Sequence, residues 1–170
     1  MNEKRGAYIR VAVAMSKAGA DNLRLTKSHS GYFLRGIIDW AEDGGKANLS
    51  HKRAPLTYRY SVKAESMKYE KTAYEDRNKR DADKEKKLHA EHVIPNIVVF
   101  NKFVEMVESG SSEQELSEFL DENCEIIVIT KAEAALLDSV LGLRKEMPDG
   151  WEWGDDRYAL LSAAGIKIEQ

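Results

Sequence analysis

The spacing of apolar residues predicts helices through the first half of the chain. Residues 7–18 are rich in alanine and predict the first helix, although the alternation of Ile and Val within them also suits a strand. A serine cap, Ser28 or Ser30, precedes a segment whose apolar residues recur at helical spacing and which ends at the glycines of 44–45. Residues 61–87 contain neither Gly nor Pro and place opposite charges at helical spacings, which predicts one long solvated helix.

A different pattern begins at residue 88. Residues 88–94 (LHAEHVI) alternate and end in β-branched side chains before Pro95, which predicts a short strand and then a turn. Two helices are expected next. The first runs from about 98 to 107. The second (SEQELSEFLDE) follows a cap at Ser111 or Ser112 and contains the glutamate that completes a capping box.

The last third of the chain predicts one further strand and two helices. Residues 125–130 (EIIVIT) are β-branched between polar ends and predict a buried or pairing strand. Thr130 then caps a helix over 131–143, and 147–166 predict a turn-rich stretch followed by a short helix. Because no repeat or low-complexity linker divides the sequence, we expect a single domain over 1–170 with an α+β, mostly helical fold.

Length and composition narrow the class of protein. With 170 residues, 42% of them hydrophobic, the chain can bury a core of its own. It contains no run of about 18 apolar residues, and its charged start has too short an apolar part for a signal peptide, so we expect a soluble protein with no membrane partner. Cys124 is the only cysteine, which excludes an intrachain disulfide and favours a reducing compartment, the cytoplasm.

Charge is distributed unevenly along the chain. The net charge is −3, but residues 1–90 hold 20 Lys and Arg against 12 Asp and Glu, and residues 91–170 hold 6 against 17. The basic half can steer a polyanion such as DNA towards the protein. The two halves can equally pair with each other, within the domain or across a homodimer. Charge alone leaves both interpretations open.

Residues 88–96 (LHAEHVIPN) concentrate polar chemistry, since they hold two of the four histidines, a glutamate and a proline. Residues 88–141 are predicted to run strand, inserted helices, strand, helix. This order and the sequence EHVIP resemble the HNH, or ββα-metal, nuclease family, in which an acidic residue, a histidine and a proline close the first strand. The resemblance implies a small ββα-metal-like unit embedded in a helical domain, between a basic helical part at 1–87 and a C-terminal turn and helix at 142–170.

The resemblance also implies roles for individual residues. His92 is the general base that activates a water, Glu91 is a ligand of Mg²⁺ or another divalent cation, His89 assists as a ligand, and Pro95 makes the turn. Such a centre hydrolyses DNA phosphodiesters, because a neutral imidazole can take the proton of the water and a cation neutralises the charge that builds on the phosphate oxygens. Magnesium keeps most of its waters and needs few protein oxygens.

The sequence departs from the family on the downstream helix. The family usually offers Asn or His there, whereas this chain reads TKAEAALLDS, with Ala134 one turn before Asp138 on the same face. Asp138 is the best remaining oxygen ligand and Glu133 is the next. The four-cysteine zinc support of many HNH proteins is absent, since Cys124 is alone. These departures leave room for a nuclease-like scaffold that has lost its chemistry.

A second candidate surface is the stretch RAPLTYRYSVK at 53–63. Arg53, Arg59 and Lys63 can contact DNA phosphates, and Tyr58 and Tyr60 can stack on bases. The same pattern is also typical of half-buried tyrosines beside solvated charges. Both interpretations stay open.

Three functions follow from these features. The first is a metal-dependent endonuclease or nickase acting on DNA. The second is a catalytically inactive nuclease-like binding protein of phage or plasmid origin that blocks a host nucleoprotein complex, with a host protein or that complex as its partner. The third is a mainly helical, dimeric interaction protein. Metal-dependent cleavage separates the first from the other two, and nucleic-acid affinity separates the second from the third.

Overall fold

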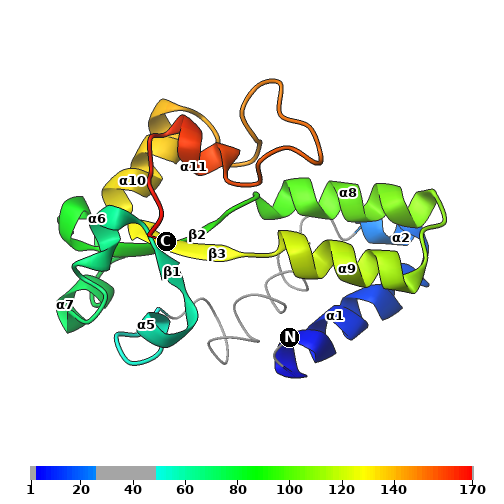
Figure 1. Ribbon diagram of the computed structural model, residues 1–170, viewed down its shortest axis with the longest axis horizontal. Coiled ribbons are helices and arrows are strands. Elements are labelled where there is room, and N and C mark those ends of the chain that lie inside the picture. Colours follow the sequence, from blue (N-terminus) through cyan, green and yellow to red (C-terminus); the bar gives the residue numbers. More distant parts are fainter. Residues whose placement is uncertain (1–2, 26–48, 170) are drawn as a thin grey trace.

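The computed structural model describes residues 3–25 and 49–169 and has an α+β, mostly helical fold, as predicted. A three-stranded sheet lies near the middle of the molecule, with helices around it and beyond one of its ends (Figure 1). The helix predicted after Ser28 or Ser30 lies outside the described residues. None of the helices within the two described ranges is both long and apolar enough to cross a bilayer.

The sheet is built around its central strand, β3 (Ile126–Thr130). All five of its residues are buried, because β-branched side chains there have neighbours on both faces. β2 (Leu88–His92) pairs with β3 antiparallel, and β1 (Arg59–Tyr60) pairs with its other edge in parallel. The register places His92, the last residue of β2, opposite Ile126, the first residue of β3. The two longer strands are therefore confirmed, whereas β1 is not predicted by the sequence pattern.

A layer of helices lies beyond this end of the sheet (Figure 1), and its members are α1 (Glu3–Ser16), α2 (Ala20–Leu25), α8 (Asn96–Glu108) and α9 (Glu113–Asn123). The chain passes through α8 and α9 between β2 and β3, so these two helices form the insertion that the sequence predicts. Of the two interpretations of residues 7–18, the helix is correct, because Ile9, Ala12 and Val13 are buried at helical spacing in the larger core.

Local hydrogen bonds set the turn between α8 and α9. Gly110 has a φ of +77°, and the N–H groups of Gly110 and Ser111 donate to the carbonyls of Val107 and Met106 at 3.2 and 2.9 Å. This left-handed ending closes α8. Ser112 then caps α9 in a complete capping box, as its sequence predicts.

A second, smaller core lies against one face of the sheet. It is covered by α5 (Ala54–Thr57), α6 (Val62–Glu65), α7 (Lys71–Tyr74) and the 3₁₀ turn η3 (Lys84–Lys86). Its buried residues come from the three short α-helices, from all three strands and, in one case, from the segment before α5: Leu49, Ala54, Tyr60, Ala64, Ala73, Tyr74, Leu88 and Val128.

The single long helix predicted over 61–87 is wrong. The chain instead forms α6, α7 and η3 with turns between them, one of which holds Asp76 at a φ of 52°. Charge pairs at helical spacing contribute only about 0.2–0.5 kcal/mol each, too little to hold an isolated helix in water. Folding back buries Ala64, Ala73 and Tyr74 against the sheet instead.

The C-terminal third begins at Thr130, which caps α10 (Lys131–Ala135) as predicted. A π-helical turn, η4 (Leu136–Val140), continues this helix, and α11 (Ala159–Ala163) is the predicted short helix. The tail returns to the sheet, where Ser61 and Ile168 form an antiparallel bridge. The outer edge of β1 is thereby covered.

Candidate functional site

The candidate catalytic unit consists of β2, β3 and α10. The two strands pair antiparallel, α10 begins where β3 ends, and α8 and α9 fill the connection between the strands. This is the order of elements that the sequence predicts. His92 is the last residue of β2. It lies at the end of the sheet that faces the layer of α1, α2, α8 and α9.

The alternation of side chains along β2 separates the predicted pair Glu91 and His92. Glu91 lies on the same face as His89, and its Oε2 is 3.4 Å from Nε2 of that histidine. His92 points to the other face, where its Nε2 lies 3.0 Å from Nδ2 of Asn96 at the start of α8. The carboxylate predicted to act beside His92 is therefore the partner of a different histidine.

The other predicted ligand, Asp138, is exposed on η4. Among residues 3–25 and 49–169, no three His, Cys, Asp or Glu side chains are grouped closely enough to hold a metal ion. The predicted set of Glu91, His89 and Asp138 thus does not come together as one metal centre.

Glu133, the next carboxylate on that helix, has a structural role. It is 5% exposed, and its Oε2 accepts hydrogen bonds from the Thr130 N–H and the Ser61 hydroxyl, both at 2.8 Å. The Thr130 hydroxyl accepts in return from the Glu133 N–H at 3.1 Å. These bonds join α6, β3 and α10, so Glu133 fixes the position of the helix that follows the second strand.

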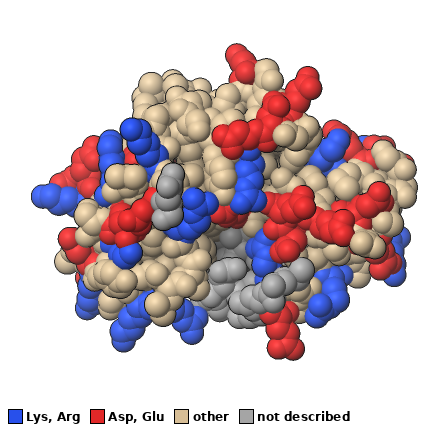
Figure 2. Space-filling view, in the orientation of Figure 1, with Lys and Arg blue, Asp and Glu red and all other residues tan. Residues whose placement is uncertain are grey.

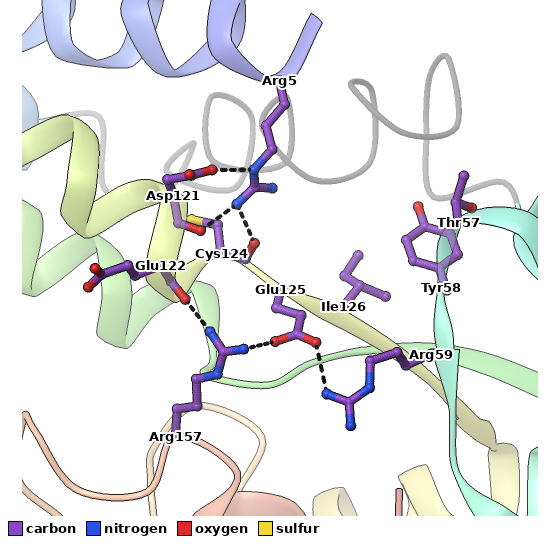
Figure 3. A pocket seen from close by; sticks show the side chains of 10 residues that line it. All are labelled: Arg5, Thr57, Tyr58, Arg59, Asp121, Glu122, Cys124, Glu125, Ile126 and Arg157. Atoms are coloured by element: carbon purple, nitrogen blue, oxygen red, sulfur yellow. Dashed lines mark hydrogen bonds and ion pairs between the residues drawn. The ribbon is translucent and has the colours of Figure 1, made fainter. Parts of the chain in front are cut away.

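A cleft of about 260 Å³ lies where β1 and β3 begin, at the end of the sheet where β2 finishes. Its walls come from the start of α1, the end of α9, the starts of β1 and β3, and the loop before α11 (Figure 3). Three arginines line it, Arg5, Arg59 and Arg157. Ile126, which pairs with His92, lines it too. Paired Cα atoms of antiparallel strands are about 5 Å apart, so His92 lies one strand away from the cleft.

Two of these arginines meet at Glu125 (Figure 3). Nη2 of Arg157 lies 2.7 Å from one oxygen of this carboxylate, and Nη1 of Arg59 lies 3.7 Å from the other. The Tyr158 hydroxyl donates to Glu125 at 3.0 Å and accepts from both arginines, at 3.0 Å from Arg59 and 2.7 Å from Arg157. The two guanidinium carbons also lie 5.5 and 4.9 Å from the centre of the Tyr158 ring. One carboxylate and one phenol therefore hold two guanidiniums next to each other.

The charge of Arg157 is maintained in this setting. Burial alone disfavours the charged form, but the hydrogen bond with Tyr158 and the negative charge of Glu125 outweigh it, so the pKa of Arg157 is raised above its ordinary value. The guanidinium therefore stays positively charged at neutral pH.

Arg5 forms the opposite wall and caps α9. Its Nε donates to the Asp121 carboxylate at 2.8 Å, and its Nη2 donates to the carbonyls of Asp121 and Cys124 at 2.8 and 2.9 Å. Carbonyls at the end of a helix lack partners within the helix, so Arg5 satisfies two of them and ties α1 to the start of β3.

The residues predicted to contact nucleic acid do not form one surface. Tyr60 is 2% exposed and its hydroxyl lies 2.8 Å from that of Tyr74 in the smaller core, so it does not stack on a base. Tyr58 and Arg59 line the cleft, whereas Arg53, before α5, and Lys63, on α6, are exposed and do not line it. In Figure 2, Lys and Arg gather at the lower left, around α5 and α7, and Asp and Glu predominate on the right, over α8 and α9. The basic and acidic side chains that are separated along the sequence are therefore also separated on this face of the molecule.

Only Tyr58 and Arg59 among the residues that line the cleft are predicted as site residues from the sequence. The main ion-pairing residues Arg5, Glu125 and Arg157 are not. They belong to segments far apart along the chain, and only folding brings them together. The one local signal is Glu125, a charge directly before the most apolar strand. A charged side chain at the end of a buried strand stays near solvent and is available for a site there.

Comparisons with known proteins were made by sequence and by structure. No family model, curated protein or solved structure matches this chain. Its function is therefore inferred from the geometry of the described residues.

Proposed function

We propose that this chain acts on DNA through the unit of β2, β3 and α10, and hydrolyses phosphodiesters with His92 as general base. The observation that carries this proposal is the position of His92. It ends the first strand of an antiparallel pair that a helix follows, and it pairs with Ile126, which lines the arginine cleft. Guanidiniums bind phosphate through strong, directed hydrogen bonds, so a phosphate held in the cleft lies one strand of the sheet away from His92.

The environment of His92 supports the role of a base. Its side chain is half-buried, and Asn96 fixes the ring through Nε2. With the amide N–H as donor, Nε2 accepts, and the neutral ring carries its proton on Nδ1. A water that replaces the Asn96 amide at Nε2 gives up its proton there as its oxygen attacks phosphorus. The bond from phosphorus to one of its two sugar oxygens breaks at the same time, and that oxygen leaves as the alcohol after it takes a proton from solvent. Asn96 is a positioning residue in this proposal.

The family resemblance implies a divalent cation, but the predicted ligands do not fit one. Glu91 faces away from His92 towards His89, and Asp138 is exposed on η4. We assign no step to a cation for this reason. The roles of Glu91, His89 and Asp138 as metal ligands stay predictions from the resemblance.

Binding of DNA without hydrolysis is the second candidate function. The separation of Glu91 from His92 favours it, because a general base without its neighbouring acid lacks one half of the centre that the resemblance implies. In this case the scaffold holds a strand in the arginine cleft, and His92 with Asn96 only joins β2 to α8.

Cleavage of supercoiled plasmid and of single-stranded DNA tests the proposal, in Mg²⁺, in Mn²⁺ and in EDTA. The wild-type protein is compared with His92→Ala and with His89→Ala, which removes a histidine from the same strand but from the opposite face. We expect cleavage by the wild type and by His89→Ala, and its loss in His92→Ala. Equal cleavage by His92→Ala overturns the role of His92. Binding without cleavage by any of the three proteins supports the second candidate.

A further inference from the structure

The arginine cleft places two guanidiniums on a single carboxylate. Arg59 and Arg157 share one carboxylate, that of Glu125, and Arg5 is paired with Asp121. The Glu122 carbonyl accepts from Arg157 at 2.6 Å, and its carboxylate, which points away in Figure 3, still raises the pKa of Arg157 by its charge. Of the carboxylates that line the cleft, only that of Glu125 is in direct contact with both Arg59 and Arg157.

This pair also keeps hydrogen-bond donors for a ligand. A guanidinium has five N–H groups. Arg157 uses three towards Glu122, Tyr158 and Glu125. Arg59 donates to the Tyr158 hydroxyl and the Glu169 carbonyl, and its distance of 3.7 Å to Glu125 is longer than a hydrogen bond. The remaining N–H groups of both arginines match the oxygens of a phosphate, which guanidiniums bind two at a time.

Both guanidiniums are held ready before a ligand arrives. Their side chains are 47% and 41% exposed, yet Tyr158 fixes them by its hydroxyl and by its ring. Exposed ion pairs contribute little to stability, about 0–1 kcal/mol, so stability alone does not call for two arginines on one carboxylate. A positioned pair loses less side-chain entropy on binding.

The shape of the cleft selects one strand over a duplex. A space of about 260 Å³ accepts a phosphate and its sugar, whereas a duplex is read by elements that protrude into its grooves. Tyr58, on the wall next to Arg59, offers an aromatic side chain to the adjoining base. A strand that leaves the cleft is repelled by the acidic surface over α8 and α9 (Figure 2). It is attracted by Arg53 and Lys63, which are exposed.

We propose that this cleft binds a phosphate of a single DNA strand between Arg59 and Arg157, with the next base on Tyr58. The inference deepens the proposed function and rests on it only for the choice of DNA as the polyanion. Glu125 is the competitor that the phosphate displaces in part, because it holds the same two guanidiniums when no strand is bound.

Fluorescence anisotropy of a labelled oligothymidylate of about 12 nucleotides measures the affinity. We expect Arg59→Gln and Arg157→Gln each to weaken binding by about tenfold and to lower the slope of affinity against salt concentration by about one ion. Glu125→Gln removes the competing charge and tightens binding by about threefold to tenfold. If the cluster is merely structural, Glu125→Gln binds the oligonucleotide no better than the wild type does.

Arg24→Gln is the matched control. The Arg24 side chain is 45% exposed and pairs with Glu108, between α2 and α8, so its loss removes the same charge without touching the cleft. We expect a change of less than about twofold. An equal effect of Arg24→Gln and Arg59→Gln overturns the site, and so does tighter binding of a duplex than of the single strand. His92→Ala should bind the strand normally even if it does not cleave, which separates failure of this inference from failure of the proposed function.

Discussion

Glu91 and His92 are neighbours in the sequence, but they lie on opposite faces of β2 and hold different partners. Glu91 lies 3.4 Å from His89 on one face, and His92 lies 3.0 Å from Asn96 on the other. In the family that EHVIP resembles, the acidic residue beside the base helps to hold a divalent cation. Here, only His92 is directed to the face that it shares with Ile126 and the cleft.

This arrangement predicts unequal effects of removing the two side chains. We expect His92→Gln to lower the rate of DNA cleavage by about 100-fold or more, as the loss of a general base does. Glu91→Gln should change the rate by less than about threefold, because it loses only its contact with His89. Initial rates of nicking measured with both variants decide this. A loss as large for Glu91→Gln as for His92→Gln shows that the carboxylate acts on the phosphate after all.

Elements set by local hydrogen bonds could be predicted from the sequence. Ser112 and Thr130 cap their helices with the glutamate three residues later, and both capping boxes are present. The alternation of β2 also implies that Glu91 and His92 point apart, but the family resemblance assigns both to one centre. The structure places the two side chains on opposite faces, as the period of the strand implies.

Features that depend on distant segments could not be predicted. β1 has two residues and exists because Arg59 and Tyr60 pair with the middle of β3. The cleft needs α1, α9, β3 and the loop before α11 to meet, and no pattern of one segment signals the other three. The charge pairs of 61–87 predict a helix locally, yet burial of Ala73 and Tyr74 decides their fold.

The two capping boxes differ in burial, which predicts different costs of breaking them. Glu133 is 5% exposed, so Glu133→Ala leaves the Thr130 N–H and the Ser61 hydroxyl buried without their acceptor. We expect it to lower the free energy of unfolding by about 2–4 kcal/mol. Glu115→Ala breaks the same motif at the exposed start of α9 and should cost clearly less. Urea denaturation of both variants measures the difference, and equal costs contradict the role of burial.

The turn between α8 and α9 depends on the backbone conformation of Gly110, which substitutions at this position test. Its φ of +77° is unfavourable for a residue with a Cβ, although nothing lies within 4 Å of the place where a Cβ would stand. Gly110→Ala should therefore cost about 1–2 kcal/mol through backbone strain alone. Gly110→Asn should cost less, because asparagine tolerates this conformation. The midpoints of chemical denaturation of Gly110→Ala and Gly110→Asn check this. A larger loss of unfolding free energy for Gly110→Asn than for Gly110→Ala indicates a steric conflict instead.

The burial of the Cys124 thiol predicts that the protein loses stability at alkaline pH. Burial raises the pKa of its thiol to about 12, against 9.0 for an unperturbed thiol, while the charge of Arg5 acts in the opposite direction. The folded protein therefore keeps the proton when the unfolded chain has lost it. This contribution is fully present below pH 9 and is lost as the pH rises from 9 towards 12.

The variant Cys124→Ala isolates that contribution from other groups that titrate in the same range. Between pH 8 and 10, the wild type should lose about 1.4 kcal/mol more of its unfolding free energy than Cys124→Ala does. The native thiol should also react with iodoacetamide at pH 8 far more slowly than the thiol of the protein unfolded in urea, since the thiolate is the nucleophile. Identical pH profiles for the two proteins, or rapid labelling of the native thiol, would mean that the junction of α9 and β3 opens readily. The wall of the cleft that Arg5 forms at the Cys124 carbonyl would then open with it.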